Sequence, residues 1–205
     1  MKYRVIGNLK DGTEMEILFS TGDIFIDCGA NVGDITEPFA QLGAVVFAFE
    51  PNKVAYDVLA KRFAQQENVK CYMSAVSTYD GVGKLYLHES NDVDPLVFST
   101  GSSLNSEKVN VNVEDYEEVD VVDLANVIEK IKKASGKNIH ILKIDIEGAE
   151  CEVVEKLMDK NLLDDIEYVL IETHEQKNPS LIDSTRKMIE RAESKGLKNV
   201  NFNWV

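Results

Sequence analysis

The sequence predicts an α/β fold: a doubly wound, mostly parallel β-sheet with helices on both faces and an N-terminal β-hairpin. Short apolar segments of strand length alternate with amphipathic segments of helical length over most of the chain, which is typical of parallel sheets crossed by helices. A glycine-rich turn, residues 29–33, joins the first buried strand to a helix. The length of 205 residues suits one domain of ordinary size.

The first 22 residues predict a hairpin extension to a main domain of residues 23–205, the whole forming a single domain. The hairpin strands, residues 3–8 and 14–19, flank the dipeptide Asp11-Gly12, and Asp-Gly is a strong signal for a tight hairpin turn. In the main domain, apolar runs predict strands over residues 23–28, 45–50, 69–76, 83–88, 119–122, 139–145, 166–173 and 197–204.

Five amphipathic segments predict the helices that connect these strands. They cover residues 34–42, 52–65, 123–136, 149–159 and 181–195. Asn52 and Asp123 are suitable N-caps, and Gly136 is suited to ending a helix. Pro38 fits only a first helical turn, so we expect regular helix from about Glu37.

Composition and charge exclude several classes of protein. Hydrophobic residues make up 44% and charged residues 28% of the chain, as in ordinary globular proteins. The net charge of −14 disfavours nucleic acid and anionic membranes as partners. No apolar run approaches the about 20 residues of a membrane span, and the N-terminus lacks the features of a secretory signal. Three cysteines favour a reducing compartment, so we expect a cytoplasmic protein.

The acidic charge is concentrated in residues 88–120. This stretch holds nine acidic residues and one basic residue, Lys108. We interpret it as a solvated acidic loop; the alternative is a flap over a site that disfavours anionic substrates.

The segment Asp27-Cys28-Gly29-Ala30-Asn31-Val32-Gly33 lies at the first strand-to-helix turn, and Glu50 ends the next strand. Glycine lets the backbone approach a ligand closely, and a strand-end acid suits the two hydroxyls of a ribose. Dinucleotides and S-adenosylmethionine (SAM) both use this geometry. Asp27 favours SAM, because a carboxylate repels a pyrophosphate but pairs with an ammonium group. The alternatives are a purely structural turn and a solvated acid at Glu50.

Five motifs occur in order along the chain: residues 27–33, Phe-Glu-Pro-Asn (49–52), Ser-Ala-Val-Ser (74–77), Leu-Lys-Ile-Asp-Ile-Glu-Gly-Ala-Glu (142–150) and Glu-Thr-His (172–174). Together they resemble the motifs of FkbM-type methyltransferases, a group of class I SAM-dependent enzymes. The resemblance covers about three-quarters of the chain, and the fourth motif is the most specific. It implies a Rossmann-like class I methyltransferase sheet and, usually, methyl transfer to oxygen, with SAM as cofactor and S-adenosylhomocysteine (SAH) as product.

The resemblance also implies a set of cofactor-binding residues. Asp27, Gly29, Asn31 and Gly33 would hold the methionine and ribose part; Glu50 would take the ribose hydroxyls, with Pro51 and Asn52 shaping that loop; Ser74, Ala75 and Val76 would lie along the adenine; and Asp145 would lie near the transferring methyl group. Ser102 and Ser103 would either fold over the cofactor or belong to a solvated loop. Two departures from the family pattern stand out: Ala125 replaces a common Asp, and only residues 197–204 remain for the terminal hairpin of the sheet.

Asp145 and His174 are the candidates for a general base. Asp145 ends a central strand, where α/β sheets place ligands, although it could instead orient the cofactor or cap the next helix. His174 titrates near neutrality, although it could simply hydrogen-bond a loop. Lys143 shares a side of its strand with Asp145, so we expect a structural ion pair; Glu147 and Glu150 are interpreted as structural acids at a helix start. Asp145, Glu172 and His174 have the residue types for a divalent metal, but no spacing requires one, and no metal is expected.

The leading functional interpretation is SAM-dependent O-methylation of a hydroxyl or carboxyl group on a small molecule or carbohydrate. One alternative is a nicotinamide-dependent oxidoreductase, which Asp27 and the lack of room for a substrate domain disfavour. The other is a non-catalytic binding module with a methyltransferase fold. The short C-terminal segment weakly favours it, and four intact motif residues disfavour it: Asp27, Gly33, Glu50 and Asp145. The identity of the acceptor and the oligomeric state stay open.

Overall fold

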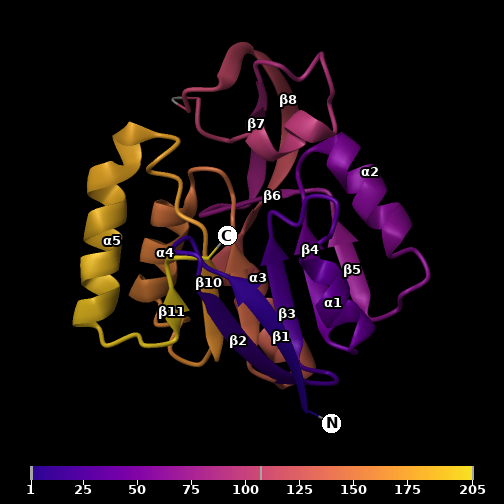
Figure 1. Ribbon diagram of the computed structural model, residues 1–205, viewed down its shortest axis with the longest axis vertical. Helices are drawn as coiled ribbons and strands as arrows, with labels where there is room; N and C mark the ends of the chain where they lie inside the picture. Colours follow the sequence, from indigo (N-terminus) through magenta and orange to yellow (C-terminus); the bar gives the residue numbers. More distant parts are fainter. Residues whose placement is uncertain (1, 107, 205) are drawn as a thin grey trace.

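A six-stranded parallel sheet forms the centre of the computed structural model, which describes residues 2–106 and 108–204. The strand order is β11-β10-β9-β3-β4-β5, and every pair is parallel (Figure 1). The strands are β3 (Ile24–Cys28), β4 (Val45–Phe49), β5 (Val69–Tyr72), β9 (Ile141–Ile144), β10 (Tyr168–Ile171) and β11 (Val200–Asn201). The predicted doubly wound α/β class is confirmed, with β3 between β9 and β4 at the centre.

Helices cover both faces of this sheet. Helices α1 (Thr36–Gln41) and α2 (Lys53–Arg62) pack on one face, and α3 (Leu124–Ser135), α4 (Glu150–Asp159) and α5 (Ile182–Ser194) pack on the other. The predicted caps are confirmed: Asn52 Oδ1 accepts from the backbone of α2, Asp123 Oδ1 accepts from the backbone of α3, and Gly136 ends α3 in left-handed backbone. Pro38 lies in the first turn of α1, where its missing N–H costs nothing.

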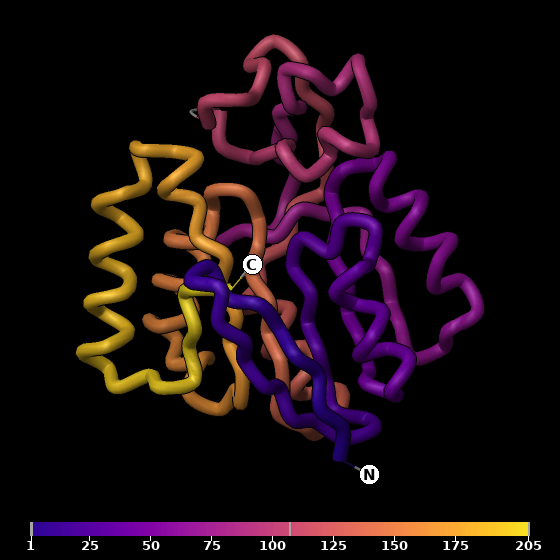
Figure 2. Tube along the Cα trace, viewed as in Figure 1, coloured from indigo at the N-terminus to yellow at the C-terminus, as the bar shows by residue number. Residues whose placement is uncertain are grey.

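The N-terminal hairpin is part of the core. Strands β1 (Lys2–Asn8) and β2 (Glu14–Ser20) pair antiparallel and lie in front of the sheet in Figures 1 and 2, on the same face as α1. Ile17 and Phe19 are buried there, and the rings of Phe19 and Phe39 are 5.2 Å apart. Trp204, near the other end of the chain, lies against Gly7. The two ends of the described chain therefore close this face of the sheet together.

The single strand predicted over residues 69–76 is wrong. The chain leaves the main sheet after β5 and enters a second sheet as β6 (Ala75–Ser77). This three-stranded sheet has the order β6-β8-β7, with β7 (Gly81–His88) and β8 (Val111–Asp123) antiparallel. A continuous apolar pattern does not reveal such a change of sheet, because the partner of each half is chosen by tertiary contacts.

The acidic stretch is also more ordered than the predicted loop. Its second half belongs to β8, which is 13 residues long rather than the four predicted. A short 3-10 helix, η1 (Val97–Gly101), precedes it. Strands β7, β8 and this segment lie above the main sheet at the top of Figure 1. The stretch is therefore a cap over one end of the main sheet, and four of its acidic side chains on β8 are exposed: Glu114, Glu117, Glu118 and Asp120.

After α5 the described chain forms the two-residue strand β11, which is shorter than the strand predicted over residues 197–204. Asn203 and Trp204 form isolated bridges with Glu172 and Leu9 instead of extending it. A 3-10 turn, η2 (Pro179–Leu181), precedes α5. Among the described helices, none is long and apolar enough to cross a membrane.

Candidate active site

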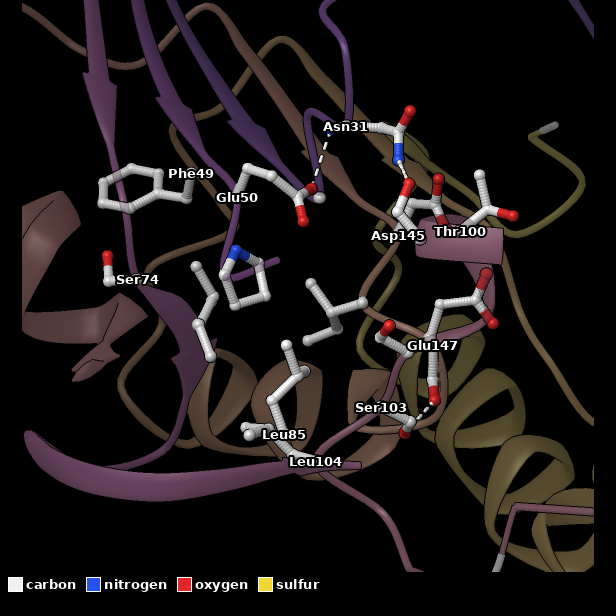
Figure 3. A pocket seen from close by; sticks show the side chains of 17 residues that line it. Asn31, Phe49, Glu50, Ser74, Leu85, Thr100, Ser103, Leu104, Asp145 and Glu147 are labelled. Atoms are coloured by element: carbon white, nitrogen blue, oxygen red, sulfur yellow. Dashed lines mark hydrogen bonds between the residues drawn. The ribbon is translucent and has the colours of Figure 1, made fainter. Parts of the chain in front are cut away.

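A cavity lies at the carboxyl ends of β3, β4 and β9, beneath the cap (Figure 3). The carboxyl edge of a parallel sheet is where such folds place ligands. Its wall consists of Gly29, Asn31, Phe49, Glu50, Pro51, Ser74, Ala75, Val76, Leu85, Ser99, Thr100, Ser102, Ser103, Leu104, Asp145, Ile146 and Glu147. Most of the predicted cofactor-binding residues therefore come together around one cavity.

The glycines of the first turn are required mainly by packing. Gly29 has φ +79, and a Cβ there would lie 1.8 Å from the backbone oxygen of Asp145. Gly33 has φ +89, and its Cβ would lie 2.5 Å from the ring of Phe63 on the far side of the turn. Gly29 lines the cavity and Gly33 does not. Gly33 was predicted to help hold the cofactor, but its position allows it only to shape the turn.

Glu50 and Asn31 form a linked pair at the cavity wall. Glu50 Oε2 accepts from the backbone N–H of Asn31 and Oε1 from that of Asn52, each at 2.8 Å. Asn31 has φ 48, and its side-chain Nδ2 donates to Ser99 in the cap at 2.9 Å. Burial raises the pKa of Glu50 to about 7, although the two backbone N–H groups oppose this. Each carboxylate oxygen keeps a second acceptor site, which suits the carboxylate for two hydroxyl groups.

The next loop and strand form an apolar slot beside Glu50. Pro51, Ser74, Ala75 and Val76 line it together with Phe49. Asn52 does not line the cavity. Its Oδ1 caps α2, and its Nδ2 donates to Ser102 at 3.3 Å, so that it connects the loop to the cap.

Asp27 lies below the turn and not at the cavity wall, so it is not placed within direct reach of a ligand there. Its Oδ2 accepts from the Thr36 hydroxyl at 2.7 Å, and its Oδ1 lies 3.2 Å from Lys143 Nζ. The reason is strand register: Asp27 on β3 is directly opposite Lys143 on β9. An influence of Asp27 on a ligand is therefore indirect in this geometry.

Lys143 lies between the buried carboxylate of Asp27 and that of Asp145 at the cavity wall. Its Nζ lies 3.2 Å from Asp145 Oδ2 and donates to the backbone oxygen of Gly29 at 2.8 Å. Burial opposes the charge, but Asp27 and Asp145 outweigh it and raise the pKa of Lys143 above its usual range. The expected ion pair with Asp145 is present, and it holds that carboxylate at the wall.

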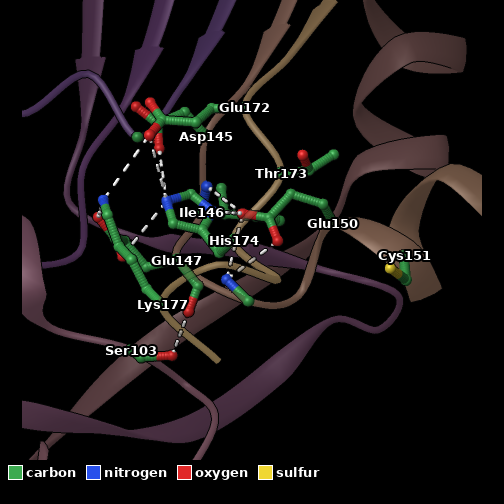
Figure 4. Close-up of polar contacts among 12 residues, drawn as sticks. Ser103, Asp145, Ile146, Glu147, Glu150, Cys151, Glu172, Thr173, His174 and Lys177 are labelled. Atoms are coloured by element: carbon green, nitrogen blue, oxygen red, sulfur yellow. Dashed lines mark hydrogen bonds and ion pairs between the residues drawn. The ribbon is translucent and has the colours of Figure 1, made fainter. Parts of the chain in front are cut away.

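His174 lies behind Asp145 and Glu147 and does not line the cavity (Figure 4). Its Nδ1 is 2.9 Å from Glu150 Oε1. Burial opposes protonation, but Glu147 and Glu150 outweigh it and raise the pKa of His174 to about 10. A group that holds its proton at neutral pH does not act as a general base. Of the two candidates for the general base, the position at the cavity wall and the raised pKa of His174 therefore favour Asp145.

Glu147 is a wall residue that the sequence analysis interpreted as structural. It has φ 57 at the turn between β9 and α4 and accepts from buried Lys108 at 2.7 Å. Burial opposes ionisation, but His174 and Lys108 outweigh it and lower the pKa of Glu147 to about 2. The signal available in the sequence was the Glu-Gly pair after a buried strand, which predicts a tight turn at the ligand edge.

Residues of the cap close the cavity from above. Ser102 and Ser103 are buried, and Ser103 Oγ donates to the backbone oxygen of Glu147 at 2.6 Å. Leu85 and Ser99 also face the cavity, and no sequence signal pointed to them. Of the two alternatives for the serine pair, the structure supports a position over the cavity rather than a solvated loop.

The wall carries three carboxylates, those of Glu50, Asp145 and Glu147, and no Lys or Arg among its described residues. Lys143 and Lys108 neutralise part of this charge from behind the wall. The cavity is therefore electrostatically suited to a cationic ligand and unsuited to a pyrophosphate.

Fold and site together define a doubly wound α/β domain with a cavity at the carboxyl edge of its parallel sheet. Residues 27–196 match the family model of the methyltransferase FkbM domain, so the chain belongs to the FkbM methyltransferase family. No curated protein matches the sequence. A crystal structure of a methyltransferase FkbM from Methylobacillus flagellatus KT is similar, with 14% identity and a TM-score of 0.49 over 84% of this chain. This chain spans 38% of that chain's length.

Proposed function

We propose that this chain is a SAM-dependent methyltransferase that transfers a methyl group to an oxygen atom of a small molecule or carbohydrate. Membership of the FkbM family supports methyl transfer. The observation that carries the choice of cofactor is the charge of the cavity wall: three carboxylates and, among the described lining residues, no basic side chain. SAM carries a sulfonium and an ammonium group, whereas a nicotinamide dinucleotide carries two phosphates.

The wall residues offer matching groups for each part of SAM. Glu50 would accept the two ribose hydroxyls, and the slot of Pro51, Ser74, Ala75 and Val76 would hold the adenine. The turn at Gly29 and Asn31, together with Asp145, would surround the methionine part. The bound cofactor supplies an electrophilic methyl group, and the protein's share is to align the acceptor and exclude water.

The acceptor oxygen must lose its proton during attack if it belongs to an unactivated hydroxyl. Asp145 is the carboxylate at the cavity wall that Lys143 holds in place. We assign it the role of proton acceptor. The cap supplies Ser99, Ser102 and Ser103 to cover the reacting groups.

Calorimetric titration of the full chain with SAH and with NAD tests the cofactor. We expect binding of SAH and no binding of NAD. Glu50→Ala should weaken SAH binding by about thirtyfold, because two charge-assisted hydrogen bonds are lost. Glu67→Ala, an exposed acid outside the cavity, is the control and should bind as the wild type does. Tighter binding of NAD than of SAH, or unchanged SAH affinity in folded Glu50→Ala, would contradict the proposal.

A further inference from the structure

We propose that Asp145, Glu147 and His174 form a binding site for one divalent first-row metal cation at the wall of the cavity. The two carboxylates come from the turn after β9, and the imidazole comes from the segment after β10. One ligand atom from each residue lies within 4.8 Å of the others (Figure 4). The sequence analysis considered Glu172 in place of Glu147 and expected no metal.

The strongest observation is a buried nitrogen atom without a partner. The His174 side chain is 1% exposed, and its Nε2 has no hydrogen-bond partner among residues 2–106 and 108–204. This nitrogen points at Glu147 Oε2, 3.4 Å away, and at Asp145 Oδ1, 3.6 Å away. A buried polar atom left unpaired costs free energy, so this nitrogen points to a ligand between it and the carboxylates.

The spacing of these atoms matches metal coordination. Ligands about 2.1 Å from a metal lie about 3.0 Å apart at right angles and about 3.4 Å apart in a tetrahedron. The two distances from Nε2 are close to the tetrahedral value. The ligand atoms of Asp145 and Glu147 lie within 4.8 Å of each other, so all three groups can reach one cation.

A second carboxylate already orients the imidazole. Nδ1 of His174 lies 2.9 Å from Glu150 Oε1, and Glu150 is itself held by the backbone N–H groups of Ile146 and Gly148. Because a carboxylate accepts, Nδ1 donates to Glu150, and a cation bound at Nε2 would take the place of the second ring proton. This carboxylate–histidine arrangement is the usual support of a metal-binding histidine.

The competing explanation is a purely structural network of charges. Lys108 lies 2.7 Å from Glu147, and exposed Lys177 lies 3.9 Å from it. In that explanation a second proton on His174 occupies the place that we assign to the cation. Lys108 contacts the same Oε2 of Glu147 that faces Nε2, and a carboxylate oxygen keeps a second lone pair that a metal can use.

The donor set indicates the class of metal. One imidazole nitrogen with two carboxylate oxygens suits Mn²⁺, Fe²⁺ or Zn²⁺, whereas Ca²⁺ prefers six to eight oxygens. Three protein ligands leave coordination positions open. Asp145 and Glu147 line the cavity, so an open position is available to an acceptor oxygen. This last step rests on the proposed function; the metal site does not.

Titration of the full, chelator-treated protein with Mn²⁺, followed by the electron paramagnetic resonance signal of free Mn²⁺, tests the site. We expect one bound Mn²⁺ per chain. Glu147→Gln should weaken it by about tenfold or more. Glu118→Gln, which removes an exposed carboxylate of β8, is the matched control for cations held by the acidic surface and should bind as the wild type does.

Two results would overturn the proposal: no Mn²⁺ bound by the wild type at millimolar concentration, or equal binding by Glu147→Gln and Glu118→Gln. If Glu147→Gln does not fold, Asp145→Asn carries the same expectation. Calorimetry with SAH on the same preparations keeps the two proposals apart. Mn²⁺ binding without SAH binding would contradict the cofactor proposal alone, and the reverse would contradict the metal site alone.

Discussion

Asp27 illustrates at the residue scale how a neighbouring strand changes the role of a side chain. It is fully buried, and its carboxylate is shared between Lys143 and Thr36. Removing one member of a buried ion pair leaves the other charge poorly compensated. Lys143 keeps Asp145 as a second partner, which limits the loss.

We predict that Asp27→Asn lowers the free energy of unfolding by about 2–3 kcal/mol. The measurement is equilibrium unfolding in denaturant. Asp57→Asn is the control, because it breaks an exposed pair with Lys53 and should cost about 0.5 kcal/mol or less. Equal stability of the two variants, with weaker SAH binding by Asp27→Asn alone, would instead support direct contact between Asp27 and the ligand.

Glu50 should make cofactor binding depend on pH. Its pKa is about 7 in the ligand-free protein, and the form that accepts two hydroxyls is the ionised one. Below that pKa a proton must leave before binding, so SAH should bind about tenfold more weakly at pH 6 than at pH 8. Calorimetry at the two pH values measures this. Glu50→Ala should lose the dependence, and the same slope in that variant would assign it to another group.

The raised pKa of Glu50 affects folding stability in the direction opposite to its effect on SAH binding. The pKa of Glu50 rises from 4.5 to about 7 on folding, so between these values the folded state binds more protons than the unfolded state. The contribution of Glu50 to stability therefore falls as the pH rises through this window. Bound cofactor should offset this loss, because it favours the ionised carboxylate.

At the scale of elements, the turn between β3 and α1 depends on the fit of its backbone against the turn after β9. Gly29 and Asp145 are in such close contact that no side chain fits between them. This contact also sets the position of Asp145 relative to Lys143, whose Nζ donates to Gly29. Gly29 therefore allows the turn after β3 and the turn after β9 to pack directly against each other.

We predict that Gly29→Ala costs about 4 kcal/mol or more, or prevents folding, because the new Cβ would overlap the backbone of Asp145. Gly136→Ala is the matched control. Gly136 is also left-handed, with φ +67, but a Cβ there meets nothing within 4 Å, so only the strain of about 1–2 kcal/mol applies. Thermal and denaturant unfolding compare the two. Similar losses would show that backbone strain, and not the contact, makes Gly29 necessary.

At the scale of the whole molecule, the N-terminal hairpin completes one face of the sheet. Residues far apart in sequence, Ile17, Phe19, Phe39 and Trp204, share one hydrophobic cluster there. An extension that shares the core contributes to the stability of the whole domain.

We predict that Phe19→Ala costs about 3–5 kcal/mol of unfolding free energy through the cavity that it leaves. Leu18→Ala, the neighbouring residue with 43% exposure, is the control and should cost about 0.5 kcal/mol. A single unfolding transition is expected for both variants. A small effect of Phe19→Ala, or separate melting of the hairpin, would show that residues 2–20 are an independent appendage.

The sequence by itself determined the class of the fold, the order of its elements and most of the cavity wall. Strand and helix periodicity, the caps at Asn52 and Asp123 and the turn at Gly29 are local signals, and they were sufficient because parallel strands bring their carboxyl ends to one edge. Glu50, Ser74 and Asp145 met at the cavity for that reason.

Only the tertiary structure decided where the chain changes sheets after Tyr72, how the acidic stretch becomes a cap, and which carboxylates surround His174. It also decided that Asp27 pairs with Lys143 below the turn. Each of these depends on register or contact between segments far apart in sequence. Local pattern carries no information on such pairings, because a side chain's nearest charge is chosen when strands and turns pack together.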